Sequence, residues 1–261
     1  QSDFISLDDA NIFSSTSNQS KAGDLIIDTF GLSLNNASTL ASFSYSQAKS
    51  GDVTIDAGQA VLAEKSFIAN GLNKEILDSD TDPFALGDAG DISINAGSLR
   101  LEGGSFIRNA QLDTALSGDV SITSDEIKLA GRSFISTESV PLYQSDFSNR
   151  TEVDQSGSVS IKTKSLDLSD SSYVKTTTVI PKRNAGDITI EADSVSLNGR
   201  SSMLSNTEPN KFEPEQDLTG LDYGKAGRLE IKTGFLKIAD QSKISSDSFT
   251  SGDGGDVVVT A

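Results

Sequence analysis

The amino-acid sequence predicts an all-β fold, a right-handed parallel β-helix of about seven to eight coils with three short strands in each coil. Two observations predict it. A glycine followed by alternating apolar residues recurs along the 261 residues, and later apolar residues keep the same distances from that glycine in successive copies. Such self-similarity is the sequence signature of a solenoid. The signature glycines are Gly23, Gly51, Gly90, Gly118, Gly157, Gly186, Gly227 and Gly255.

Five offsets from the signature glycine are apolar in nearly every copy: two, four, nine, eleven and seventeen residues after it. In one copy these offsets hold Ile92, Ile94, Leu99, Leu101 and Ile107. A spacing of two is the period of a β-strand, so each copy is expected to form three strands separated by turns. Stacked copies would pair equivalent strands in parallel and fill the interior with apolar ladders. A β-sandwich, the alternative, would not keep five offsets through seven consecutive copies.

Two details of the pattern make sharper predictions. Counting seventeen residues from Gly186 places Met203 inside and its neighbour Leu204 outside. Offset sixteen is aromatic in four successive copies, and the strand period places these rings on the exterior, opposite the inward column. We therefore expect an exterior aromatic ladder, formed by Phe67, Phe106, Phe134 and Tyr173.

The spacing of the signature glycines alternates between 28 or 29 residues and 39 or 41 residues. The extra length follows the third expected strand, so we expect insertion loops at 70–89, 137–156 and 206–226 on a single β-helix that spans 1–261. The loops hold fourteen acidic and four basic residues, ten of the chain's 17 net negative charges. They also hold candidate ligand- or partner-binding aromatic residues, which in the structural alternative only pin each loop to the body: Phe84, Tyr143, Phe147, Phe212 and Tyr223.

The composition excludes several classes of function. The chain has no cysteine and no histidine, which excludes a disulfide framework and a histidine-based catalytic or zinc site. A net charge of −17 would repel nucleic acid and anionic membranes. No stretch approaches the roughly 18 consecutive apolar residues of a membrane span, so we expect no insertion into a membrane.

Calcium is the one cofactor that the acidic residues suggest. The run DSDTD alternates acids as calcium loops do, which makes Asp78, Asp80 and Asp82 candidate ligands, although the glycine and terminal glutamate of an EF-hand loop are absent. A second candidate is the aspartate that follows the signature glycine in six copies. Such a column would either bind calcium or accept backbone N–H groups in Asx-type turns, and Ser158 and Arg228 interrupt it.

The run AGDISINAGSLRLEGGSFIRNA, residues 89–110, resembles the repeats of large filamentous-haemagglutinin-like exoproteins. These are the β-helical passengers of two-partner secretion, and the repeat style is that of cyanobacterial members. The resemblance covers essentially the whole chain, but the N-P-N motifs of the family's secretion domain are absent. It implies a secreted or cell-surface protein, an outer-membrane secretion partner, and a role in adhesion or filament formation.

We therefore expect a non-catalytic segment of a longer extracellular fibre or adhesin, a stalk whose acidic loops lie along one edge for surface attachment. Candidate partners are a surface glycan, a protein receptor, or other copies of the chain through lateral or end-to-end association. Two alternatives stay open. One is a polysaccharide-degrading β-helix enzyme, a lyase or glycosidase. The other is a calcium-stabilised surface filament that polymerises head to tail.

Overall fold

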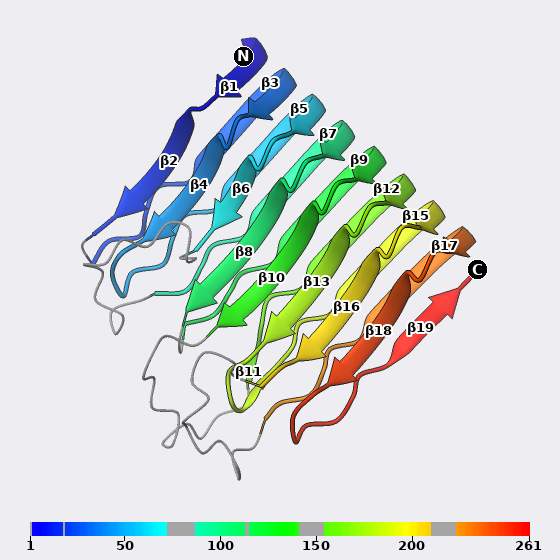
Figure 1. Cartoon of the computed structure of the whole chain (residues 1–261). Coiled ribbons are helices and arrows are strands. Elements are labelled where there is room, and N and C mark those ends of the chain that lie inside the picture. Colours follow the sequence, from blue (N-terminus) through cyan, green and yellow to red (C-terminus); the bar gives the residue numbers. More distant parts are fainter. Residues whose placement is uncertain (1, 18, 72–86, 113–114, 141–153, 210–222) are drawn as a thin grey trace.

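The computed structural model describes residues 2–17, 19–71, 87–112, 115–140, 154–209 and 223–261, and these form a parallel β-helix (Figure 1). Equivalent strands stack from the N-terminal to the C-terminal end. The nine-stranded sheet contains, in spatial order, β1 (Ser2–Asp8), β3 (Leu25–Asn35), β5 (Val53–Leu62), β7 (Ile92–Leu101), β9 (Val120–Leu129), β12 (Val159–Leu168), β15 (Ile188–Leu197), β17 (Leu229–Ile238) and β19 (Val257–Thr260).

The other strands form two more walls of the coil. The eight-stranded sheet contains β2 (Asn11–Thr16), β4 (Thr39–Ser44), β6 (Phe67–Asn70), β8 (Phe106–Leu112), β10 (Phe134–Val140), β13 (Tyr173–Thr178), β16 (Ser202–Thr207) and β18 (Lys243–Ser248). A third, two-stranded sheet pairs β11 (Asp154–Gln155) with β14 (Arg183–Asn184). All of the pairings between these strands are parallel, as the repeat predicts.

The register between coils follows the offsets of the sequence repeat. Ile92 pairs with Val120, Ile94 with Ile122, and Leu101 with Leu129. The apolar offsets are nearly all buried in the central coils and form one continuous core. Burying each such side chain stabilises the fold by about 1.5–3 kcal/mol, so the stack of coils is held together chiefly by its interior ladders.

The expectation of three separate strands is wrong in one respect. The first two expected strands form one continuous strand, such as the ten residues of β5, which bends after offset six. Ala57 pairs with Ala96 and Gln59 with Ser98, whereas Gly58 and Gly97 between them do not pair. A small buried residue at offset six allows the bend. Where that residue is Ser or Thr, its hydroxyl donates to the carbonyl two residues later, so the strand bends without ending.

The two sharper predictions are confirmed. Met203 is fully buried and pairs with Val174 of the inward column, whereas Leu204 is only half-buried. The four aromatic rings at offset sixteen are not part of the interior cluster and form a ladder outside it, in which Phe67, Phe134 and Tyr173 are half-buried and Phe106 is buried. Phe67, Phe106, Phe134 and Tyr173 stack in sequence, with ring centroids 4.7 Å apart and planes within 3° at each of the three contacts.

The signature glycine is explained by the stacking of coils rather than by turn geometry. None of the eight signature glycines has a positive φ. A Cβ at Gly118 would instead overlap the carbonyl group of Gly90 one coil before, and the same collision recurs at Gly157, Gly186 and Gly227. The backbones of successive coils therefore approach too closely at this corner for any side chain.

Candidate functional site

Most of the candidate residues in the insertion loops lie outside the described residues: Phe84, Tyr143, Phe147 and Phe212, together with the calcium candidates Asp78, Asp80 and Asp82. Tyr223 is described. It is only 7% exposed, and its backbone forms an antiparallel bridge with Pro181. A ring that is buried in this way offers little surface to a partner, which favours the alternative in which an aromatic residue pins the loop to the body.

The aspartate column after the signature glycine bonds to the backbone of the next coil. One carboxylate oxygen of Asp24 accepts the N–H of Asp52 at 2.9 Å, and Asp52 accepts the N–H of Asp91 in the same way. The carboxylates therefore serve the backbone, but each bond joins two coils and is not the Asx turn that we expected within one coil. Among the described residues, no group of three or more acidic side chains is arranged to hold a metal ion.

Hydrogen bonds and nearby charges shift the pKa values of three charged groups. The pKa of Asp24 lies below its ordinary value of 3.8 because the N–H of Asp52 and the ammonium of Lys21 both bond to the carboxylate. The same contact raises the pKa of Lys21. The pKa of Glu230 is lowered chiefly by its hydrogen bond with Lys232, with Arg228 adding to the effect.

Two polar columns that the sequence pattern did not single out also serve the backbone. Offset nineteen holds Ser, Asn or Thr in every copy, and its side chain donates to the carbonyl of a signature glycine; Asn109 reaches Gly90 at 2.7 Å. Offset fifteen is serine in all seven copies. The hydroxyl of Ser105 donates to the carbonyl of Glu102 at 2.7 Å and closes the corner. A search for constant polar offsets, in addition to apolar ones, would have found both columns.

One charged side chain is fully buried in the described part of the chain. Arg183 of β14 has no exposed surface; it donates to the Asp154 carboxylate at 2.8 and 3.2 Å and to the carbonyl of Ala115 at 2.8 Å. This bidentate pair joins the two strands of the smallest sheet. Because these contacts link β14 to β11 and to the backbone at Ala115, we interpret the pair as structural.

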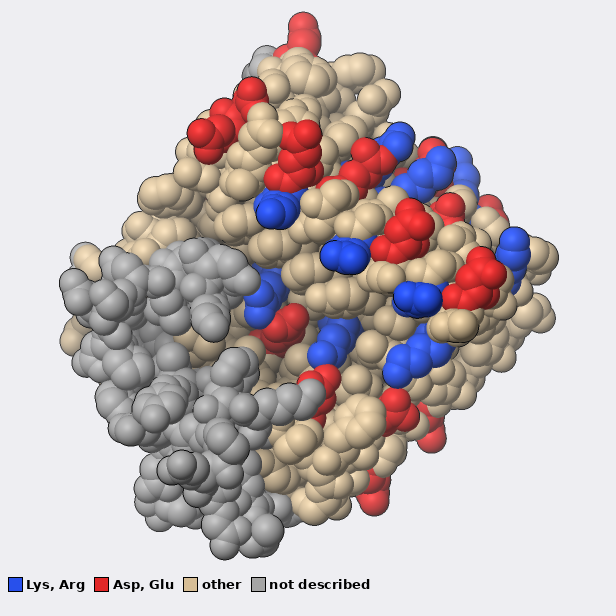
Figure 2. Space-filling model, in the orientation of Figure 1, with Lys and Arg blue, Asp and Glu red and all other residues tan. Residues whose placement is uncertain are grey.

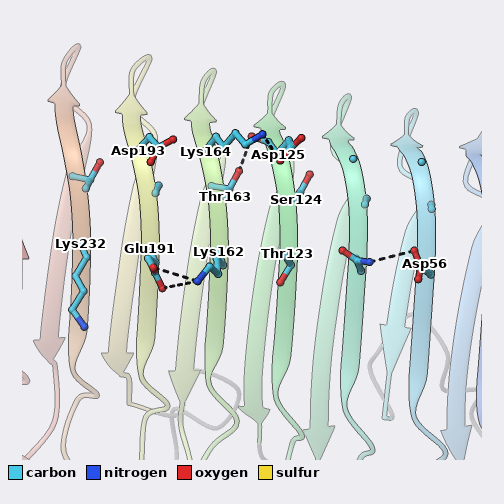
Figure 3. A pocket seen from close by; sticks show the side chains of 17 residues that line it. Asp56, Thr123, Ser124, Asp125, Lys162, Thr163, Lys164, Glu191, Asp193 and Lys232 are labelled. Carbon is cyan, nitrogen blue, oxygen red and sulfur yellow. Dashed lines mark hydrogen bonds and ion pairs between the residues drawn. The ribbon is translucent and has the colours of Figure 1, made fainter.

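The best candidate for a binding site is an open groove of about 890 Å³ on the outer face of the nine-stranded sheet, at the strand bend (Figure 3). It crosses six neighbouring strands, from β5 to β17, which corresponds to about 24 Å at a strand spacing of about 4.8 Å. The small bend residues lie along its floor. Exposed side chains at offsets five and seven line its two sides, including Asp56, Asn95, Lys162 and Asp125.

Each of the three lysines that line the groove contacts a carboxylate. Lys162 lies 3.3 Å from Glu191, and Lys164 lies 2.9 Å from Asp125 (Figure 3). The third groove lysine, Lys232, lies 3.0 Å from Glu230. Figure 2 likewise shows acidic and basic side chains interspersed on the face that it displays, without a field of one sign.

Comparisons with known proteins find no match to this chain among family models, curated proteins or solved structures. The resemblance to filamentous-haemagglutinin-like repeats thus stays an expectation from the sequence. Within the described residues, no helix has the length and hydropathy needed to cross a membrane.

Proposed function

We propose that this chain is a segment of a non-catalytic extracellular fibre or adhesin of the filamentous-haemagglutinin-like kind, exported to the cell surface with an outer-membrane partner. The observation that carries the proposal is the unbroken stacking of nine strands in register, with the length variation of the repeat confined to one corner. A solenoid of this kind extends by adding coils, and each coil contributes about 4.8 Å. Such a rod suits a stalk that carries laterally placed loops.

The proposed attachment surface is the edge that carries the three insertion loops, with their ten net negative charges. The 28-residue copies provide a matched control because their coils close without an insertion. In the fibre, each long loop would be replaced by the short connection of such a copy. The rod should keep its fold, and attachment of the cells to their surface should fall. If a folded fibre without the long loops attaches as well as the parent fibre, the loops are not the attachment surface and the segment is a passive stalk.

The size of the native protein tests the fibre itself. Mass spectrometry of the intact protein from its source should give a chain several times larger than the 27.4 kDa of this segment, and electron microscopy should show rods. A mature chain of only this size would remove the long-fibre proposal and favour head-to-tail polymerisation. Release of new reducing ends from acidic or neutral glycans would instead favour the polysaccharide-degrading enzyme.

A further inference from the structure

We propose that the groove at the strand bend binds a linear, neutral polysaccharide along the fibre axis. This inference goes beyond the fibre role, because a passive stalk and an adhesin would both present the same groove. It rests on three features of the described residues: an exposed aromatic ring on the strand that borders one end of the groove, hydrogen-bonding side chains along the sides, and the absence of an unpaired lysine among the residues that line it.

The aromatic ring is that of Phe30, which is 69% exposed on β3. Its edge lies close to the backbone of Gly58, where a Cβ added to the glycine would stand 3.2 Å from the ring. Gly58 and Gly97 line this end of the groove without side chains, which leaves the space beside the ring open. A pyranose has an apolar C–H face that packs on an aromatic ring and hydroxyl groups at its rim, and a flat platform of this kind fits that shape.

Polar groups for the sugar hydroxyls lie directly beside the platform. The side-chain amide of Asn95 donates to Asp56 at 3.3 Å, and both residues are exposed and line the groove. Beyond this bond, the amide keeps a second N–H and its carbonyl oxygen, and the carboxylate keeps lone pairs, so both can bond to sugar hydroxyl groups. A few placed polar groups beside an apolar surface are the usual composition of a small-molecule site.

The charge balance favours a neutral ligand. Four acidic residues and three lysines line the groove, and each lysine already contacts a carboxylate at 3.3 Å or less, so an acidic polysaccharide would meet a net negative charge. The length also fits an extended chain. The groove runs across the strands, and the strand spacing of about 4.8 Å is close to the length of one sugar residue.

The phenylalanine has a structural alternative, because an aromatic side chain often covers a strand glycine to fill the space above it. Phe4 covers Gly31 in this way. The two roles make different predictions. A covering ring affects only stability, whereas a binding platform affects affinity for a glycan when the protein is fully folded.

The test is calorimetric titration of the 261-residue chain with linear hexasaccharides of β-linked glucose, xylose and N-acetylglucosamine, and with a polygalacturonate oligomer as the acidic comparison. At least one neutral hexasaccharide should bind, with little dependence on salt because the ligand is uncharged. Phe30→Ala and Asn95→Ala should each weaken binding about tenfold. Phe249→Ala removes a similarly exposed ring elsewhere and should leave the affinity unchanged.

Thermal unfolding of each variant, measured in parallel, separates the two roles of Phe30. The inference is overturned if no neutral hexasaccharide binds, if folded Phe30→Ala and Asn95→Ala proteins bind as tightly as the parent chain, or if only the acidic oligomer binds. These outcomes leave the fibre proposal standing. New reducing ends in the same mixtures would instead contradict the non-catalytic proposal and leave binding in the groove intact.

Discussion

Replacing Phe134 by Leu removes a ring that stacks on two neighbours, Phe106 and Tyr173, whereas replacing Phe67 by Leu removes a ring with one stacked neighbour. Both rings are partly exposed on the same outer face. An aromatic pair contributes about 0.5–1.5 kcal/mol beyond its buried area. Phe134→Leu should therefore lose about 1–3 kcal/mol of stacking energy, and Phe67→Leu about half as much.

Urea unfolding followed by circular dichroism measures this difference. If both variants keep the slope of the parent transition, the shift of the midpoint reports the change in the free energy of unfolding. A double-mutant cycle adds an internal control. Phe106 and Phe134 are in contact and should show a coupling energy, whereas Phe67 and Phe134 are not stacked and should show almost none. Equal losses for the two single variants, or no coupling in the contacting pair, would refute the additive ladder.

Three further predictions concern the interior, the glycine corner and the aspartate column. Ile122→Asp should abolish the folded state in gel filtration and circular dichroism because it buries an unpaired charge, whereas Ser121→Asp, exposed on the same strand, should not. Gly118→Ala should destabilise the chain by about 1–3 kcal/mol in calorimetry through collision with the main chain of Gly90, but Gly254→Ala, where a Cβ makes ordinary contact, should not. In NMR titration, Asp24 should protonate below its ordinary pKa of 3.8. Because this pKa is lowered in the folded state, its stabilising effect is present above the ordinary value and is lost as the pH falls through the lowered pKa. Asp24→Asn should remove that part of the acid sensitivity.

The interior of the β-helix was predictable because each inward position recurs at one offset in every coil. Met203 shows the strength of this argument. Intrinsic strand preference would have favoured Leu204, but the count from Gly186 places Met203 inside, where it pairs with Val174. A repeated offset therefore outweighs the preference of a single residue, since a one-residue slip would turn every side chain of the strand to the wrong face.

The strand bend was not predictable from the same pattern. The Asp-Ala-Gly of 56–58 is typical of a turn, and it marks the point where the alternation of buried residues shifts by one. In the structure, the shift occurs at a small residue followed by one position that does not pair. The parallel pairing with the next coil continues before and after these two positions. The groove depends on this bend and on which neighbouring offsets are small, so it becomes visible only when the coils are stacked. The aromatic residues of the long loops have no equivalent positions in other coils, and the repeat therefore carries no information on their placement.

The structural roles of the different offsets indicate which positions can change without loss of the fold. The carboxylate after the signature glycine bonds to the next coil, offset nineteen serves a glycine carbonyl, and offset fifteen closes a corner. A change at any of these offsets leaves a backbone group of the stack without its partner, which is costly when that group is buried. The outward offset five has no such duty in the backbone, and it holds Asp56, Asn95, Thr123, Lys162, Glu191 and Lys232 in successive coils. The side chain at offset five can therefore differ from coil to coil without loss of the fold. Because this offset lies beside the bend in each of these coils, the differing side chains line a single groove.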